Sequence, residues 1–195
     1  MHTRYSDDLR FPRFPRFPRF PRFQGACLVF AAAAAAGCAS MQAPSVPEAI
    51  RAPAGEKLAQ KIYAKGVQMY KCLPGKSDPA KNEWTFQAPE AGLFSDAGMQ
   101  QSIGKHYAGP TWEGLDGSKV VGEVKGNVAS TDSFSIPWLL LTTKSTSGSG
   151  VFSNVSSIQR VDTKGGRSPQ GNCSENQKDV SIRVDYTSLY YFYTR

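Results

Sequence analysis

Histidine and cysteine are scarce in this chain, which holds two histidines and four cysteines in 195 residues. Since His2 lies at the start of the chain, His106 is the only histidine in its body. A zinc site needs three or four His, Cys, Asp or Glu ligands, so the composition predicts no metal site. No Gly-x-Ser-x-Gly elbow is present, and any catalytic triad would depend on one histidine. We therefore predict neither a bound metal nor a cofactor.

Positive charge is also scarcer than the formal net charge of +7 suggests. Six of the 23 basic residues and two of the 16 acidic ones precede Cys38, leaving 17 basic and 14 acidic residues and a net charge of +3. A nucleic-acid-binding domain has clustered Lys and Arg and a more basic balance. The body of the chain is therefore predicted not to bind nucleic acid.

Long hydrophobic runs are absent as well. A basic Phe-Pro-Arg repeat, from Phe11 to Arg22, precedes an apolar run that ends in Ala31–Ala36. The repeat is either a basic tail or an over-extended start of the reading frame, and we favour the second. A run of about a dozen apolar residues is too short for a transmembrane helix and is typical of a secretory signal. Residues 1–40 are thus predicted to be the repeat and a signal sequence, the alternative to the signal being a buried alanine-rich helix.

The end of this run resembles a bacterial lipobox, the site at which a cysteine is lipidated. The motif is Ala35-Ala36-Gly37-Cys38, with Ala35 where leucine is typical. We therefore predict a lipid anchor at Cys38 that holds the protein to the membrane of the bacterial envelope. Ordinary cleavage at a nearby alanine, which would leave a periplasmic or secreted protein, stays open as the alternative. Both interpretations predict export.

Two cysteines remain in the body of the chain once Cys27 and Cys38 are assigned to the signal. In an oxidising compartment, two lone cysteines most simply form a disulfide. We therefore predict a bridge between Cys72 and Cys173, the alternative being two free buried thiols.

The rest of the chain has the pattern of strands separated by turns. Residues 180–186 alternate apolar and polar side chains, the period of a half-buried strand, and 138–143 read as a strand buried on both faces. Residues 56–63 are ambiguous, because Leu58 and Ile62 have helical spacing. We predict a linker over 41–55 and one all-β exported domain over 56–195. Its fold is a sandwich or barrel of short, mostly antiparallel strands.

Several blocks of sequence are distinctive. They are Ala64–Cys72, Lys105–Glu113, Asp116–Gly122, Ile136–Leu141, Ile158–Gly166 and Tyr190–Tyr193. In these blocks the chain resembles domain-of-unknown-function family 3455, over roughly residues 46–195. The resemblance implies an uncharacterised exported protein with no agreed substrate or cofactor.

The stretch from His106 to Asp116 is the best candidate site. His106 beside Glu113 or Asp116 could act as a general base, which would make the protein a small exported hydrolase or lyase. The structural alternative, which we favour, is that His106 is packed and hydrogen-bonded near Trp112. Tyr107 and Trp112 are then candidates for binding a ligand. The favoured prediction is a non-enzymatic envelope domain that binds an unknown ligand or envelope partner.

Overall fold

The structure is a computed structural model that describes residues 41–195. The predicted signal sequence and Cys38 therefore lie outside the described residues. Within 41–195 the chain forms nine strands and two short 3₁₀ helices, which confirms the all-β prediction. No helix in this range is long and apolar enough to cross a membrane.

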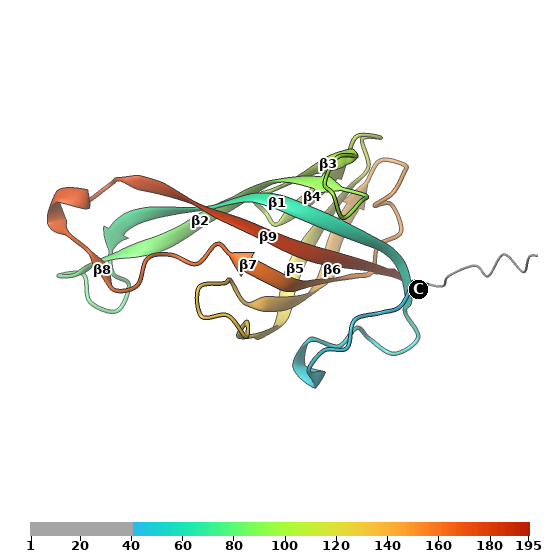
Figure 1. Cartoon of the computed structure of the whole chain (residues 1–195), viewed down its shortest axis with the longest axis horizontal. Helices are drawn as coiled ribbons and strands as arrows, with labels where there is room; N and C mark the ends of the chain where they lie inside the picture. The colour runs from blue at the N-terminus through green and yellow to red at the C-terminus, as the bar shows by residue number, and fades with distance from the viewer. Residues whose placement is uncertain (1–40) are drawn as a thin grey trace, which may run out of the picture. The chain divides into compact units, whose positions relative to one another are not determined.

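Eight of the strands form a closed antiparallel barrel (Figure 1). Each strand pairs with its neighbour in sequence, from β1 through β7, and β9 follows β7. Because β1 pairs with both β9 and β2, the sheet closes on itself and these strands have no free edge along the barrel. The strands are β1 (Lys57–Pro74), β2 (Asn82–Phe94), β3 (Ser102–Tyr107), β4 (Thr111–Gly114), β5 (Lys119–Val128), β6 (Trp138–Ser147), β7 (Ser157–Gly165), β8 (Asn172–Cys173) and β9 (Ser181–Thr194).

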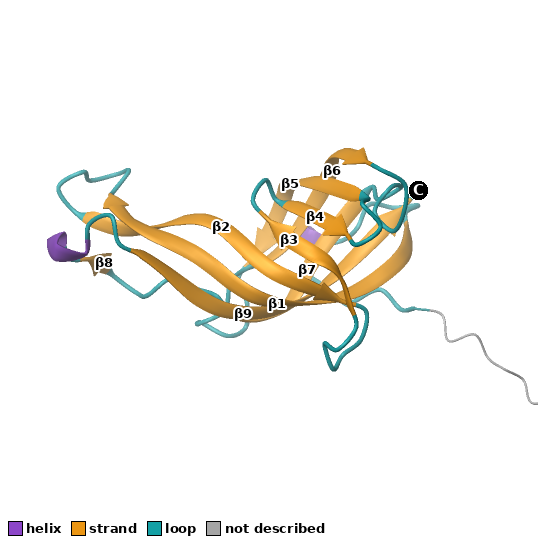
Figure 2. Ribbon diagram, turned by 90° about the horizontal axis from the view of Figure 1, so that it is seen from above, coloured by secondary structure: helices purple, strands orange, loops and turns teal. Residues whose placement is uncertain are grey.

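Three strands are longer than the sequence pattern predicted. β1, β2 and β9 run past the barrel together as a twisted ribbon, which Figure 2 shows from above. At the far end of the ribbon β8 pairs with β2, and the Cys72–Cys173 disulfide joins β8 to β1 with 6.0 Å between the Cα atoms. The predicted bridge is thus confirmed. The expectation of short strands is wrong for these three, because each continues to pair beyond the barrel.

The ambiguous segment 56–63 lies mostly in strand β1. Leu58 packs against a cluster on the outer face of the barrel, whereas Ile62 belongs to the core inside it. In a regular strand, residues four apart lie on the same face, but a bulge between Leu58 and Gln60 shifts the register against β9. The bulge explains why Leu58 and Ile62, although four residues apart, contribute to clusters on opposite faces of the sheet.

The first part of strand β6 packs against apolar clusters on both of its faces, as the sequence of residues 138–143 predicted, whereas Lys144–Ser147 are exposed. Leu139 and Leu141 contact the interior core, whereas Trp138 and Leu140 contact the outer cluster. The interior core fills one half of the barrel with apolar side chains. It includes Ile62, Ala64, Leu93, Val120, Phe152, Val155, Ile158 and Phe192.

The outer cluster is covered by the segment that precedes β1. This segment contains the helix η1 (Glu48–Ile50), and the side chain of Ile50 is fully buried against Tyr191 and Tyr193. The Nε2 group of Gln159 donates a 2.6 Å hydrogen bond to the carbonyl oxygen of Ile50. Gly126 permits the approach, since a Cβ there would overlap the carbonyl of Ala49. Part of the segment 41–55, which we interpreted as a linker, is thus packed against the barrel.

Candidate functional site

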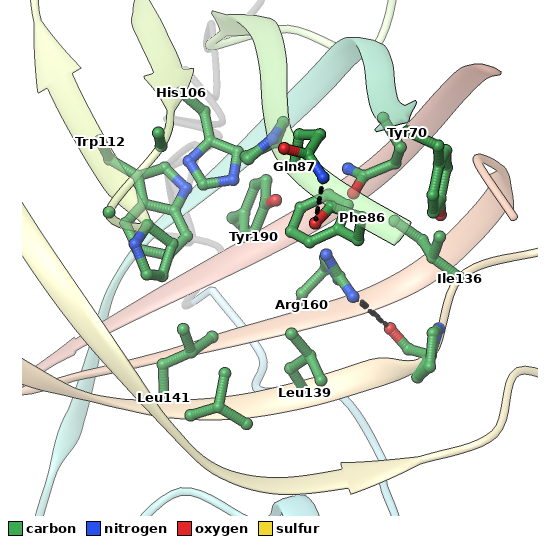
Figure 3. Close-up of a pocket in the computed structure, with 17 residues that line it drawn as sticks. Tyr70, Phe86, Gln87, His106, Trp112, Ile136, Leu139, Leu141, Arg160 and Tyr190 are labelled. Atoms are coloured by element: carbon green, nitrogen blue, oxygen red, sulfur yellow. Dashed lines mark hydrogen bonds between the residues drawn. The ribbon is translucent and has the colours of Figure 1, made fainter. Parts of the chain in front are cut away.

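The half of the barrel that the core leaves unfilled contains a cavity of about 340 Å³ (Figure 3). All eight barrel strands contribute side chains to it. An eight-stranded barrel is just wide enough to hold one small ligand when side chains do not fill its interior. The residues labelled in Figure 3 are Tyr70, Phe86, Gln87, His106, Trp112, Ile136, Leu139, Leu141, Arg160 and Tyr190.

The cavity has a buried floor and an exposed apolar rim. His106, Trp112, Tyr190 and Leu141 line its inner part and are each at most 2% exposed. Phe86, by contrast, lines the cavity while remaining 49% exposed. The interior is therefore accessible from this end of the barrel, and an apolar molecule entering it would meet an apolar side chain first.

His106 is held at the floor by two contacts. Its imidazole stacks on the indole of Trp112, and its Nδ1 lies 2.9 Å from the carbonyl oxygen of Thr111. Because a carbonyl only accepts, Nδ1 carries the proton and the neutral ring leaves Nε2 as an acceptor. Burial lowers the pKa of His106 to about 3. A base with so low a pKa is poorly matched to proton transfer near neutral pH.

Neither of the predicted partners of His106, the carboxylates of Glu113 and Asp116, lies beside it in the cavity. Because side chains alternate along β3, the Tyr107 hydroxyl faces away from the lumen and donates a 2.7 Å hydrogen bond to Glu113. This hydrogen bond, together with Lys105 and Lys119, lowers the pKa of Glu113.

Asp116 is used in a turn. Its carboxylate accepts hydrogen bonds from the backbone N–H groups of Ser118 and Val151, at 2.9 and 2.8 Å. The hydroxyl of Ser118 is a third donor and the main cause of a lowered Asp116 pKa. Among residues 41–195, no Asp or Glu lines the cavity. The structure thus does not bring the predicted acid–base pair together.

The predicted ligand-binding residues are divided between the two faces of the sheet. Trp112 lines the cavity, whereas Tyr107 points outward to Glu113. The aromatic run at the end of the chain divides in the same way: Tyr190 and Phe192 face the interior, and Tyr191 and Tyr193 face the outer cluster.

Several buried polar atoms around the cavity have no protein partner. Nε2 of Gln68, Nε1 of Trp112 and the hydroxyl of Tyr190 make no hydrogen bond within the described part of the chain. These side chains are 3%, 1% and 1% exposed. The Tyr186 hydroxyl interacts with both Gln68 and Tyr190. Buried polar groups are nearly always paired in folded proteins, so Nε1 of Trp112 marks the place where a ligand or ordered water supplies a partner.

Sequence reasoning missed Arg160 and Gln68. Arg160 lies on β7 two residues after the buried Ile158, so both side chains face the barrel interior. The sequence signal that could have identified Arg160 is its spacing of two residues from the apolar Ile158, which places both side chains on the same face of a strand. The alternation by itself does not say which face is inside, because Val161, on the other face, is buried too.

The remaining chemistry is limited. Within residues 41–195, no three His, Cys, Asp or Glu side chains cluster in a way that could hold a metal ion. The cavity therefore offers hydrogen-bonding groups, one cation and an apolar wall.

The family comparison agrees with the resemblance in the sequence. The model described as "Protein of unknown function (DUF3455)" matches residues 53–194, which span the whole barrel and the ribbon. Neither the curated proteins nor the solved structures contain a match to this chain.

Proposed function

The chain belongs to the DUF3455 family of proteins of unknown function, and we propose that its barrel is a non-enzymatic binding domain for one small, mainly apolar ligand. The observation that carries this proposal is the cavity between the eight strands, with its buried floor and exposed rim. Its volume of about 340 Å³ lies at the small end of the range typical of ligand sites.

The state of His106 favours binding over catalysis. The side chain is stacked, buried and neutral, and the carboxylates that could assist it are engaged elsewhere. General acid–base catalysis requires a group whose pKa lies near the working pH. The cavity residues instead combine hydrophobic side chains with a few polar groups, the usual composition of a binding pocket.

Titration with N-phenyl-1-naphthylamine, a neutral probe that fluoresces in apolar surroundings, tests this function. We expect saturable binding at one site per chain. Leu139→Trp fills the cavity from a partly buried position and should weaken binding at least tenfold. Leu115→Trp adds the same ring at a residue that is 77% exposed and outside the cavity, and should leave binding unchanged. Equal binding by the wild type and Leu139→Trp would place the probe elsewhere and reject the proposal.

We also propose that the domain acts outside the cytoplasm, anchored by lipid at Cys38. The support is the three-part signal pattern of residues 1–40 and the lipobox-like sequence at its end. The Cys72–Cys173 disulfide is compatible with this location, because such bonds persist in oxidising compartments.

Fractionation of cells expressing single Cys→Ser variants tests the anchor. Cys38→Ser should release the protein from the membrane fraction, whereas Cys27→Ser, a matched change within the apolar run, should leave it there. If Cys38→Ser stays with the membranes, the lipid anchor is wrong. If the wild type remains in the cytoplasm, export is wrong as well.

A further inference from the structure

Among residues 41–195, Arg160 is the one ionised side chain that lines the cavity. Its Nε and Nη2 groups donate hydrogen bonds of 3.2 and 2.9 Å to the carbonyl oxygen of Pro137 (Figure 3). In the sheet it lies between Leu139 on β6 and Tyr190 on β9. These contacts hold the guanidinium in one place, partly buried at the side of the cavity.

No carboxylate neutralises this cation. Arg160 forms no ion pair with any Asp or Glu of residues 41–195, and His106, which faces the same cavity, is neutral. A guanidinium has five N–H donors, and the Pro137 carbonyl engages two of them. The others remain available to an anion.

The unpaired groups nearby favour the same kind of ligand. Nε1 of Trp112 is a donor only, and Nε2 of Gln68 and the hydroxyl of Tyr190, which lie beside the Tyr186 hydroxyl, can donate as well. Unused donors and a cation favour a ligand that presents acceptor oxygens to this side of the cavity. A carboxylate supplies acceptors on both oxygens and matches the planar fork of arginine, whereas an amine would be repelled by it.

We propose that the ligand carries a carboxylate and that Arg160 selects it. The inference rests on the binding function proposed above and specifies the class of ligand: a small acid with an apolar body. The apolar body lies against Leu139 and Leu141, and the carboxylate meets Arg160. Arg160 thus determines the preference for a charged ligand over a neutral one of the same shape.

Calorimetric titration with 1-naphthylacetate and its neutral amide, 1-naphthylacetamide, tests this preference directly. The two probes share the same apolar body and differ in charge. We expect the wild type to bind the acid at least tenfold more tightly than the amide. Arg160→Gln should remove that preference, so that the acid and the amide bind the variant with affinities within about twofold of each other.

Arg167→Gln is the matched control. Arg167 also donates to a backbone carbonyl, that of Ser133, at 2.7 Å, but it does not line the cavity. This variant should retain the preference for the acid. Saturable binding of N-phenyl-1-naphthylamine by Arg160→Gln would show that its cavity still forms.

The outcomes separate the two proposals. If the wild type binds the acid and the amide equally, or if Arg160→Gln keeps the preference, the role of Arg160 is rejected while binding in the cavity stands. If neither naphthyl compound nor the neutral probe binds, the proposed function fails and this inference fails with it. The comparison in the wild type requires no variant, so the inference stays testable even if Arg160→Gln does not fold.

Discussion

The imidazole of His106 lies nearly parallel to the indole of Trp112, with the ring centroids 4.4 Å apart and the ring planes at 16°. The two residues are direct cross-strand partners on β3 and β4. The Tyr190 ring packs against both in a T-shaped arrangement, with its centroid 5.3 Å from the centroid of each ring. This aromatic cluster forms the floor of the cavity and removes His106 from water. The only histidine in the body of the chain is therefore a packed residue of the cavity floor.

The stability of the domain should fall as the pH falls below 6.5. Burial lowers the pKa of folded His106 to about 3, whereas in the unfolded chain it returns to about 6.5. Between these values the unfolded state binds a proton that the folded state excludes. The contribution of neutral His106 to the free energy of unfolding is therefore complete above pH 6.5. It is lost progressively toward pH 3, by at most about 1.4 kcal/mol per pH unit.

Urea unfolding of the wild type and His106→Gln at pH 7.5, 6.5, 5.5 and 4.5 measures this effect. The variant lacks the titrating group, so its free energy of unfolding should change less over the range. Shared carboxylates contribute equally to both proteins and cancel in the comparison. Parallel pH profiles would mean that His106 titrates normally in the folded state.

Removing the disulfide should destabilise the fold substantially. Cys72 and Cys173 are 101 residues apart, and a bridge closing a loop of this length contributes about 4.7 kcal/mol in the chain-entropy model. We expect the double variant Cys72→Ser/Cys173→Ser to lose a few kcal/mol of unfolding free energy in urea. Non-reducing peptide mapping of the wild type is the control, and finding both cysteines as free thiols would contradict the bridge.

Gln159 should determine whether the segment before β1 stays on the barrel. Besides its bond to Ile50, it accepts a 2.5 Å hydrogen bond from the hydroxyl of Tyr193. Gln159→Leu leaves those buried groups unpaired, at an expected cost of about 1–3 kcal/mol. Trypsin should then cleave after Arg51 faster than in the wild type. Gln100→Leu, at an exposed position, is the control and should show the wild-type rate; equal rates in all three proteins would contradict the role of Gln159.

On β3 and β4, the sequence predicted the positions of some side chains of the candidate site but not of others. The alternation of side chains was sufficient to place Tyr107 and His106 on opposite faces, and the structure places them so. It could not place Glu113, because the separation of Glu113 from His106 depends on how β4 pairs with β3. The register sets His106 opposite Trp112 and Lys105 opposite Glu113.

By itself the sequence determined the strand-rich fold and the cysteine pair. Strand alternation in 180–186 is a local property, and only Cys72 and Cys173 remained once two cysteines were assigned to the signal. The tertiary structure alone decided that β1 meets β9, the last strand, to close the barrel and that Arg160, Gln68 and Tyr190 line one cavity. These residues are brought together by pairing between strands far apart in the chain. Such pairing depends on the packing of the whole sheet, which no short segment encodes.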